Sequence, residues 1–362
     1  MISGKATADG SAAYAAKHAD AAPQHWRPAL GLTLSSLGMG SYLGNADPVT
    51  DGKYASACQK ALASGINVLD SAVNYRYQRS ERNLGAGLKK AIEAGTVTRD
   101  QVLICTKGGF ISGDMGPPDR NWFLDTYVKP GIATETDFVA GGHCMTPKYI
   151  RHELGLSLKN FDVETIDVYY VHNPETQAAA VGESEFYSRL TAVFRELEAC
   201  AAEGKIQCYG TATWHAFRVP PGHESHMSLE KTLACAVEAG GRDHRFRVIQ
   251  LPYNLGLPEA MSHASQGAAS ILDAAAAAGL AVFTSVPLMQ GQLLGRFGAD
   301  FKTKFPGLKT DAQRCLQFAR STPGVTAPLC GMKDVAHVEE NSVLRTVASF
   351  TPAEFNVLVG RS

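Results

Sequence analysis

Short apolar runs alternate with amphipathic stretches along most of this chain. Between the runs, leucine, alanine and aromatic residues recur at helical spacing, for example over 148–159 and 186–203. Eight such alternations favour a parallel (β/α)8 barrel, because this number of units allows the sheet to close. We therefore predict an α/β fold of the TIM-barrel type. The strands are expected at residues 37–42, 66–70, 102–106, 166–171, 206–209, 247–250, 281–284 and 326–329.

Two segments fall outside this repeat. Residues 1–29 have little to bury beyond Tyr14, so we expect a flexible N-terminal arm, with one barrel domain over 30–362. The connection 108–146 after the third strand far exceeds the usual length of about 2–6 residues. Because it leaves the barrel at its catalytic rim, we predict a lid or substrate wall that includes Trp122. The alternative is a structural insertion packed on the side of the barrel.

Four polar side chains follow three of the predicted strands. Asp70 ends one strand and Tyr75 lies five positions later, while Lys107 and His172 end the next two strands. The carboxyl ends of barrel strands share one rim, so we expect these residues to converge on one pocket. Each alone has a structural explanation, such as a turn, a packed ring or a hydrogen-bonded histidine. The functional interpretation depends on all four lying at the same rim.

Together these residue types suit the reduction of a carbonyl group. The charge of Lys107, held by Asp70, is expected to lower the pKa of Tyr75 from about 10 toward neutrality. Tyr75 is then a candidate general acid, and His172 a hydrogen-bond donor to the oxygen that gains negative charge.

The motifs around these residues resemble those of the aldo-keto reductase superfamily. Segments 70–75, 80–85, 106–107 and 172–175 are similar to the signatures Asp-x-Ala-x-x-Tyr, Ser-Glu-x-x-Leu-Gly, Thr-Lys and His-x-Pro-Asp/Glu. The resemblance runs from about residue 34 to 341. It implies a (β/α)8 barrel that uses a nicotinamide cofactor, usually NADPH, without a metal. It also implies the same roles for the four residues, and we expect Tyr42, Asn173 and Trp122 to contact the substrate.

The resemblance further implies a cofactor groove along the rim, with two departures. Ser285 stands where many members have a tyrosine that stacks on the nicotinamide, and only Thr213 remains of a pair that binds the carboxamide. We expect Trp214 or a residue of the long loop to replace the missing contact with the nicotinamide. His337 stands where arginine often holds the 2'-phosphate, so Lys333 is the phosphate candidate and NADP is expected, with NAD possible. The expected cofactor contacts are Gly40, Ser41, Tyr42, Asp70, Thr213, Gln250, Ser285, Pro287, Leu288, Gly291, Gly331, Met332, Lys333, His337, Glu340 and Asn341.

The charge balance, the apolar runs and the cysteine spacing limit what the protein is expected to bind and where it is expected to reside. The 34 Lys and Arg residues against 35 Asp and Glu leave no basic excess, which argues against nucleic acid as a partner. No run of about 18 apolar residues and no apolar leader occur, so neither a membrane span nor a secretory signal is predicted. The eight cysteines form no CxxC pair, which favours a reducing cytoplasm over zinc or disulfides.

Three functions are compatible with this sequence. The first is an NAD(P)H-dependent oxidoreductase that interconverts an aldehyde or ketone and its alcohol, with Tyr75 as general acid/base. The second is an NAD(P)-dependent sugar or polyol dehydrogenase. The third, of another class, is a nicotinamide-binding sensor or regulatory subunit with little turnover. The sequence leaves the substrate, the direction of the reaction and the oligomeric state open.

Overall fold

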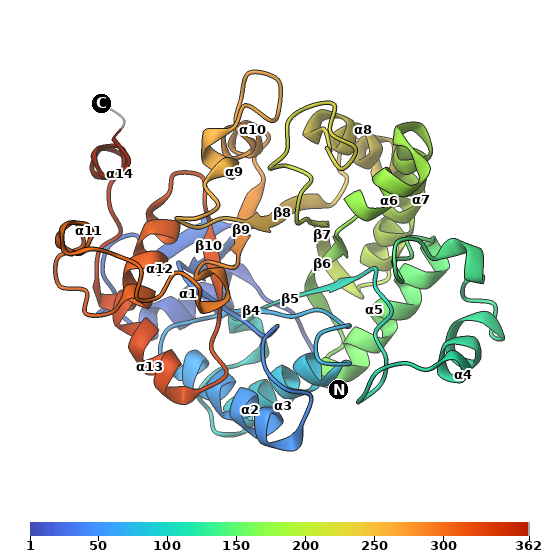
Figure 1. Ribbon diagram of the computed structural model, residues 1–362. Helices are drawn as coiled ribbons and strands as arrows, with labels where there is room; N and C mark the ends of the chain where they lie inside the picture. Colours follow the sequence, from blue (N-terminus) through green and yellow to red (C-terminus); the bar gives the residue numbers. More distant parts are fainter. Residues whose placement is uncertain (361–362) are drawn as a thin grey trace.

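The computed structural model of the protein describes residues 1–360, in which eight parallel strands close into a barrel. Hydrogen bonding follows the order β10-β3-β4-β5-β6-β7-β8-β9, and helices surround the strands (Figure 1). The predicted (β/α)8 barrel is confirmed. Its strands are β3 (Gly38–Gly40), β4 (Val68–Asp70), β5 (Leu103–Gly108), β6 (Ile166–His172), β7 (Ile206–Ala212), β8 (Phe246–Pro252), β9 (Ala281–Ser285) and β10 (Ala327–Gly331).

Several of the helices between the strands begin at polar caps that the sequence supplies. Asp47 accepts a hydrogen bond from the amide of Thr50 at the start of α2, and Thr146 does the same for Tyr149 at the start of α5. The barrel helices are α2 (Pro48–Ala63), α3 (Arg79–Glu93), α5 (Pro147–Phe161), α7 (Glu183–Ala202), α8 (Leu229–Gly240), α10 (Ile271–Ala277), α12 (Asp311–Ser321) and α13 (Val335–Ser342). Shorter or additional helices are α1 (Ala8–Lys17), α4 (Arg120–Phe123), α6 (Glu175–Val181), α9 (Glu259–Ser262), α11 (Ala299–Thr303) and α14 (Pro352–Leu358). None of the helices within residues 1–360 is both long and apolar enough to cross a bilayer.

The core has two layers because side chains on a strand point alternately to its two faces. On β5, Leu103 and Cys105 belong to the cluster inside the barrel, whereas Ile104 belongs to the larger cluster that includes buried helix residues. The strands are therefore buried on both faces, which explains their nearly continuous apolar runs.

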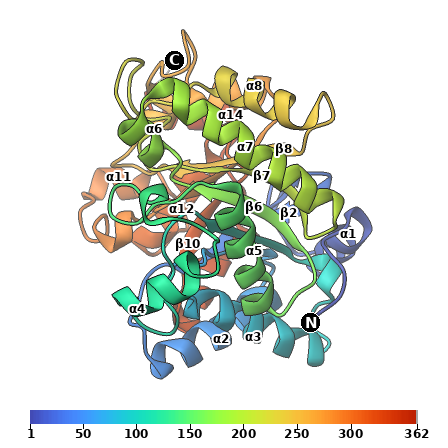
Figure 2. The same ribbon diagram turned by 90° about the vertical axis from the view of Figure 1, so that its right-hand side faces the viewer.

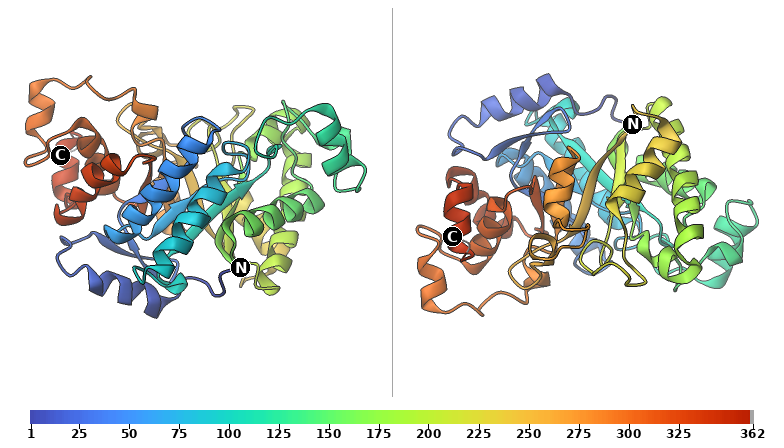
Figure 3. Two further views of the ribbon diagram at one scale, coloured as in Figure 1. Left: turned by 90° about the horizontal axis from the view of Figure 1, so that it is seen from below. Right: turned by 90° about the horizontal axis from the view of Figure 1, so that it is seen from above.

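The N-terminal segment is ordered, which corrects the expectation of a flexible arm. Tyr14 on α1 is fully buried, and its hydroxyl donates a hydrogen bond to the carbonyl of Leu62 at 2.6 Å. Strands β1 (Trp26–Ala29) and β2 (Leu32–Ser35) then form an antiparallel hairpin. Leu32 and Leu34 of this hairpin join the interior cluster, and the side-chain amide of Asn67, which precedes β4, donates to the carbonyl of Thr33 at 3.0 Å. The hairpin therefore lies at the amino ends of the strands, away from the predicted site (Figure 3). Small residues in α1 concealed this packing, since Tyr14 is its only large buried side chain.

The long connection 108–146 packs mainly on the side of the barrel. Its middle contains α4 and a π-helical turn over Leu124–Val128, and these lie outside α5, far from the hairpin (Figure 2). Tyr127 in this turn is fully buried, and its hydroxyl donates to Oε1 of Glu153 on α5 at 3.0 Å. The rings of Trp122 and Phe138 pack against Tyr127 at centroid distances of 5.4 and 5.8 Å. The middle of the connection is thus the structural insertion of the alternative, and the expectation of a lid is wrong for it.

Candidate active site

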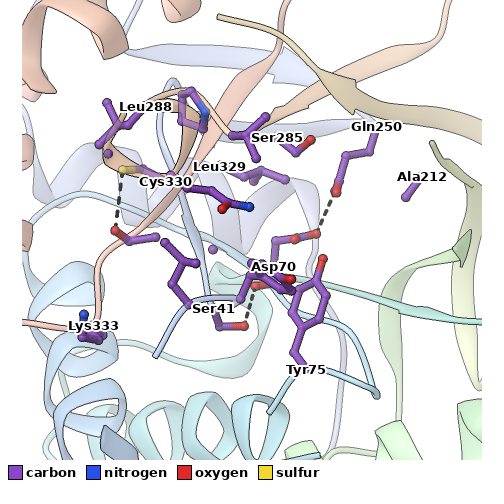
Figure 4. A pocket seen from close by; sticks show the side chains of 18 of the residues that line it. Ser41, Asp70, Tyr75, Ala212, Gln250, Ser285, Leu288, Leu329, Cys330 and Lys333 are labelled. Atoms are coloured by element: carbon purple, nitrogen blue, oxygen red, sulfur yellow. Dashed lines mark hydrogen bonds between the residues drawn. The ribbon is translucent and has the colours of Figure 1, made fainter. Parts of the chain in front are cut away.

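A cavity of about 610 Å³ opens among the carboxyl ends of the strands. Its lining comes from all eight barrel strands or the loops that follow them, and from α2, α12 and α13. Three predicted catalytic residues, Asp70, Tyr75 and His172, line the cavity, and Lys107 lies behind them, fully buried. Figure 4 shows Asp70, Tyr75 and Gln250 grouped on one side, with Lys333 at the far side. The convergence predicted for the four residues is therefore observed.

Lys107 and Asp70 form a buried ion pair at the floor of this site. Nζ of Lys107 lies 2.6 Å from Oδ1 of Asp70 and also donates to the carbonyl of Ser71 at 2.6 Å. The other oxygen of Asp70 accepts a hydrogen bond from Nε2 of Gln250 at 2.8 Å. Burial by itself lowers the pKa of Lys107, but the neighbouring Asp70 and Tyr75 outweigh this effect, and the net pKa is raised. Lys107 is thus held as a cation.

Tyr75 lies directly above this pair, with Nζ of Lys107 5.0 Å from its ring centroid. Burial raises the pKa of Tyr75, and the charge of Lys107 only partly opposes that increase. The expectation of a pKa lowered toward neutrality is therefore wrong for the protein alone. The physical reason is that burial destabilises the phenolate more than the charge of Lys107 stabilises it. That charge is already paired with Asp70. Tyr75 is consequently a phenol that can donate its proton.

His172 completes the reaction end of the cavity as a neutral ring. Its pKa is lowered well below the usual value by burial, and the charge of Lys107 adds to the effect. The ring packs edge-on against Tyr75 at 5.8 Å and against Phe110 at 5.2 Å. Nδ1 of His172 is buried without a hydrogen-bond partner among the described residues. The backbone carbonyl of His172 accepts from Nε2 of His143, which holds this strand end in place.

Most residues predicted to hold a cofactor or substrate line the same cavity. Two do not: Met332 is fully buried outside the lining, and Trp122 packs on Tyr127 instead. Trp122 was expected at the rim because its loop leaves the barrel there, but burial of Tyr127 draws the loop sideways. The predicted residues in the lining are Gly40, Ser41, Tyr42, Asp70, Asn173, Thr213, Gln250, Ser285, Pro287, Leu288, Gly291, Gly331, Lys333, His337, Glu340 and Asn341.

Some of these side chains have structural hydrogen bonds. The hydroxyl of Ser41 contacts the hydroxyl of Ser71 at 2.9 Å, and that of Thr213 donates to the carbonyl of Gln250 at 3.3 Å. Nε2 of Gln250 is committed to Asp70. Their direct roles in holding a cofactor therefore stay predictions.

The far end of the cavity carries features that fit an adenosine. Asn341 is buried and lines the cavity, and within residues 1–360 its Oδ1 has no hydrogen-bond partner. An unpaired buried acceptor suits the amino group of a purine, because leaving it unpaired costs about 1–3 kcal/mol. Lys333 and His337 provide nitrogen donors beside it. The residues present are thus compatible with a nucleotide lying along the cavity toward Tyr75.

Several lining residues were not predicted from the sequence. Phe110 and Asn74 flank the reaction end, and Oδ1 of Asn74 is buried without a partner in the described chain. Asn74 directly precedes Tyr75, so its position in the motif was an available signal. Val286 has a left-handed φ of 49°, which is rare for a β-branched residue, and no sequence signal marked it.

The fold and the site define a barrel enzyme of the usual plan, with titratable side chains gathered at the carboxyl ends of parallel strands. A family model described as "Aldo/keto reductase family" matches residues 36–359. The chain therefore belongs to the aldo/keto reductase family.

Curated relatives resemble parts of the chain. A D-threo-aldose 1-dehydrogenase from Pseudomonas sp. is 29% identical over 188 residues, which cover 50% of this chain and 51% of the relative. An NADH-specific methylglyoxal reductase from Escherichia coli strain K12 is 25% identical over 191 residues, covering 50% and 49%. The chain thus spans about half the length of the curated relatives it matches.

Solved structures are similar over nearly the whole chain. An aldo/keto reductase from Klebsiella pneumoniae in complex with NADP and acetate has a TM-score of 0.63 at 16% identity, covering 93% of this chain and 94% of that one. A glycerol dehydrogenase from Gluconobacter oxydans gives the same TM-score and coverage at 19% identity. At these identities the likeness establishes the fold.

Proposed function

We propose that the protein is an NAD(P)H-dependent oxidoreductase that interconverts an aldehyde or ketone and the corresponding alcohol. The observation that supports this most strongly is the approach of Tyr75, His172 and the Lys107–Asp70 pair within one cavity. A nicotinamide bound in the cavity would supply the hydride to the carbonyl carbon. Tyr75 donates a proton to the carbonyl oxygen as negative charge develops there. The ring of His172 orients that oxygen, and Lys107 stabilises the phenolate that remains.

The raised pKa of Tyr75 favours reduction over oxidation near neutral pH, because reduction starts from the protonated phenol. A sugar or polyol dehydrogenase remains the second candidate. It is favoured by the match to an aldose dehydrogenase.

NADP is the proposed cofactor, with NAD as the alternative. Lys333 and His337 line the cavity near Asn341 and could bind a 2'-phosphate. Against this, the carboxylate of Asp334 lies 4.0 Å from Nζ of Lys333 and 2.8 Å from Nζ of Lys53, and it competes for these charges. A cytoplasmic location is also proposed, supported by eight unpaired cysteines that are all buried.

The substitution Tyr75→Phe tests the proposed function. We expect turnover of aldehydes, followed by loss of NADPH absorbance, to fall about 10²–10⁴-fold, because the proton donor is lost. NADPH binding, measured by titration calorimetry, should change little, since the ring remains. Tyr77→Phe is the matched control, because Tyr77 lies two residues away and outside the cavity lining. Tight NADPH binding without turnover in the unaltered protein would instead identify the sensor.

A further inference from the structure

Glu175 is a buried carboxylate that the proposed chemistry does not use. It begins α6, three residues after His172, and only 3% of its surface is exposed. One of its oxygens, Oε1, accepts hydrogen bonds from the backbone amides of Trp214 at 2.6 Å and His215 at 2.9 Å. Oε2 is buried with no partner within the described chain. The side-chain hydrogen bonds of Glu175 are therefore made to the backbone of another loop.

These two bonds join the loop after β6 to the loop after β7. Asn173 adopts a left-handed φ of 44°, and its amide donates to the carbonyl of Ala212 at 2.6 Å, which brings the two strand ends together. The amide of Thr213 donates to the carbonyl of Gln250, so the second loop is also tied to β8. Glu175 then holds the next two amides of that loop.

The residue fixed by this arrangement is the aromatic Trp214. Its side chain lines the cavity, yet the residue is 37% exposed, so it lies at the mouth and not beside the buried ion pair. On the far side of the loop, Nε of Arg218 donates to the carbonyl of Trp214 at 2.9 Å, and Nη1 of Arg218 lies 3.3 Å from Glu259. The backbone of Trp214 is thus anchored at both its amide and its carbonyl.

The rest of the mouth is aromatic or neutral. Tyr42, 55% exposed, packs edge-on to Tyr75 at 5.0 Å, and Phe110 packs on His172. Among the described residues that line the cavity, the only lysine is Lys333, which lies at the adenosine end (Figure 4). Such a mouth suits an uncharged substrate with a flat apolar face, because aromatic rings stack on such faces and no cation is present to pair with an acid.

We propose that Glu175 is a positioning residue that fixes Trp214 as the aromatic wall of the substrate entrance, and that this wall selects uncharged carbonyl compounds carrying a ring. This selectivity rests on the proposed oxidoreductase function. The anchoring of Trp214 by Glu175 does not, and it can be measured without turnover.

Kinetics with two uncharged aldehydes test the selectivity. For Trp214→Ala we expect KM for benzaldehyde to rise about 3–10-fold, as the loss of one aromatic contact implies, while KM for propanal changes little. Glu175→Ala should shift the ratio of the two KM values in the same direction. Glu175→Gln should restore the ratio, because its amide oxygen can still accept both backbone bonds. Trp122→Ala is the matched control and should leave the ratio unchanged, since Trp122 packs away from the cavity.

Fluorescence tests the anchoring on its own. The emission of Trp214 is obtained as the difference between each protein and its counterpart carrying Trp214→Phe, and acrylamide quenching reports its mobility. We expect increased quenching in Glu175→Ala and not in Glu175→Gln. If Glu175→Ala does not fold, Glu175→Asp replaces it, because the shorter side chain withdraws the carboxylate and should give an intermediate increase.

The outcomes separate the two levels of the proposal. Unchanged quenching in the folded Ala or Asp variant would overturn the anchoring role. Increased quenching with an unchanged KM ratio, or equal losses of kcat for both aldehydes, would overturn the selectivity. Increased quenching in a protein that reduces neither aldehyde would refute the proposed function and its selectivity while supporting the anchoring.

Discussion

Removing the carboxylate of the buried ion pair should destabilise the protein in a pH-dependent way. The substitution Asp70→Asn keeps the size of the side chain but removes the negative charge that lies 2.6 Å from Nζ of Lys107. At an effective dielectric constant of about 20, Coulomb's law gives an attraction of about 6 kcal/mol at that distance. Desolvation offsets part of it, and loss of one partner of a buried pair typically costs about 3–5 kcal/mol. We expect the free energy of unfolding at pH 7 to fall by this amount.

The pH dependence follows from the proton on Lys107. In the variant, the pKa of Lys107 in the folded state drops below its unfolded value of about 10.4. The folded variant can avoid burying an unpaired charge if Lys107 releases its proton. From a reference pKa of about 10.4, deprotonating a lysine costs about 4.6 kcal/mol at pH 7 but only about 1.2 kcal/mol at pH 9.5. In the unaltered protein the pKa of Lys107 is raised, so its stabilising proton is retained over this range. The gap between the two proteins should therefore narrow as the pH rises.

Equilibrium urea unfolding at pH 7, 8.5 and 9.5 measures this gap. The control is Asp125→Asn, because Asp125 pairs with Lys129 and both side chains are well over half exposed. An exposed pair of this kind contributes less than about 1 kcal/mol and should show no such narrowing. A gap below about 1 kcal/mol at pH 7, or one that stays constant to pH 9.5, would refute the charged state assigned to the pair.

Three further predictions follow from single contacts. Because the pKa of His172 is lowered and that of Tyr75 is raised, kcat/KM for reduction should vary by no more than about twofold between pH 7 and 9. It should then fall above about pH 10 as the phenol loses its proton, and a midpoint of the pH profile near pH 7 would contradict this reasoning. Tyr127→Phe removes a hydrogen bond to the buried Glu153 and should lower the free energy of urea unfolding by about 1–3 kcal/mol without changing KM for aldehydes. A change in KM with unchanged stability would instead favour a lid. Tyr14→Phe should cost about 1 kcal/mol in the same assay, and a value indistinguishable from zero would restore the flexible arm.

Much of the site was predictable because barrel geometry converts sequence order into spatial proximity. Asp70 and His172 end their strands and Lys107 is the penultimate residue of β5, and strands of one parallel barrel end at one rim. Tyr75 follows Asp70 too closely to lie elsewhere. The protonation states were not predictable in the same way. They depend on how much water is excluded around Tyr75, which the sequence does not encode locally.

The sequence by itself determined the strand and helix repeat, the barrel and the four residues that meet at its rim, because apolar periodicity and strand ends are local properties. Only the tertiary structure decided the rest. It placed α1 against the barrel through the single buried ring of Tyr14, and it turned the long connection sideways through Tyr127 and Glu153. It also brought Glu175 beneath Trp214, 39 residues away in the chain. These arrangements arise from burial and from hydrogen bonds between distant segments, whose free energies no local pattern records.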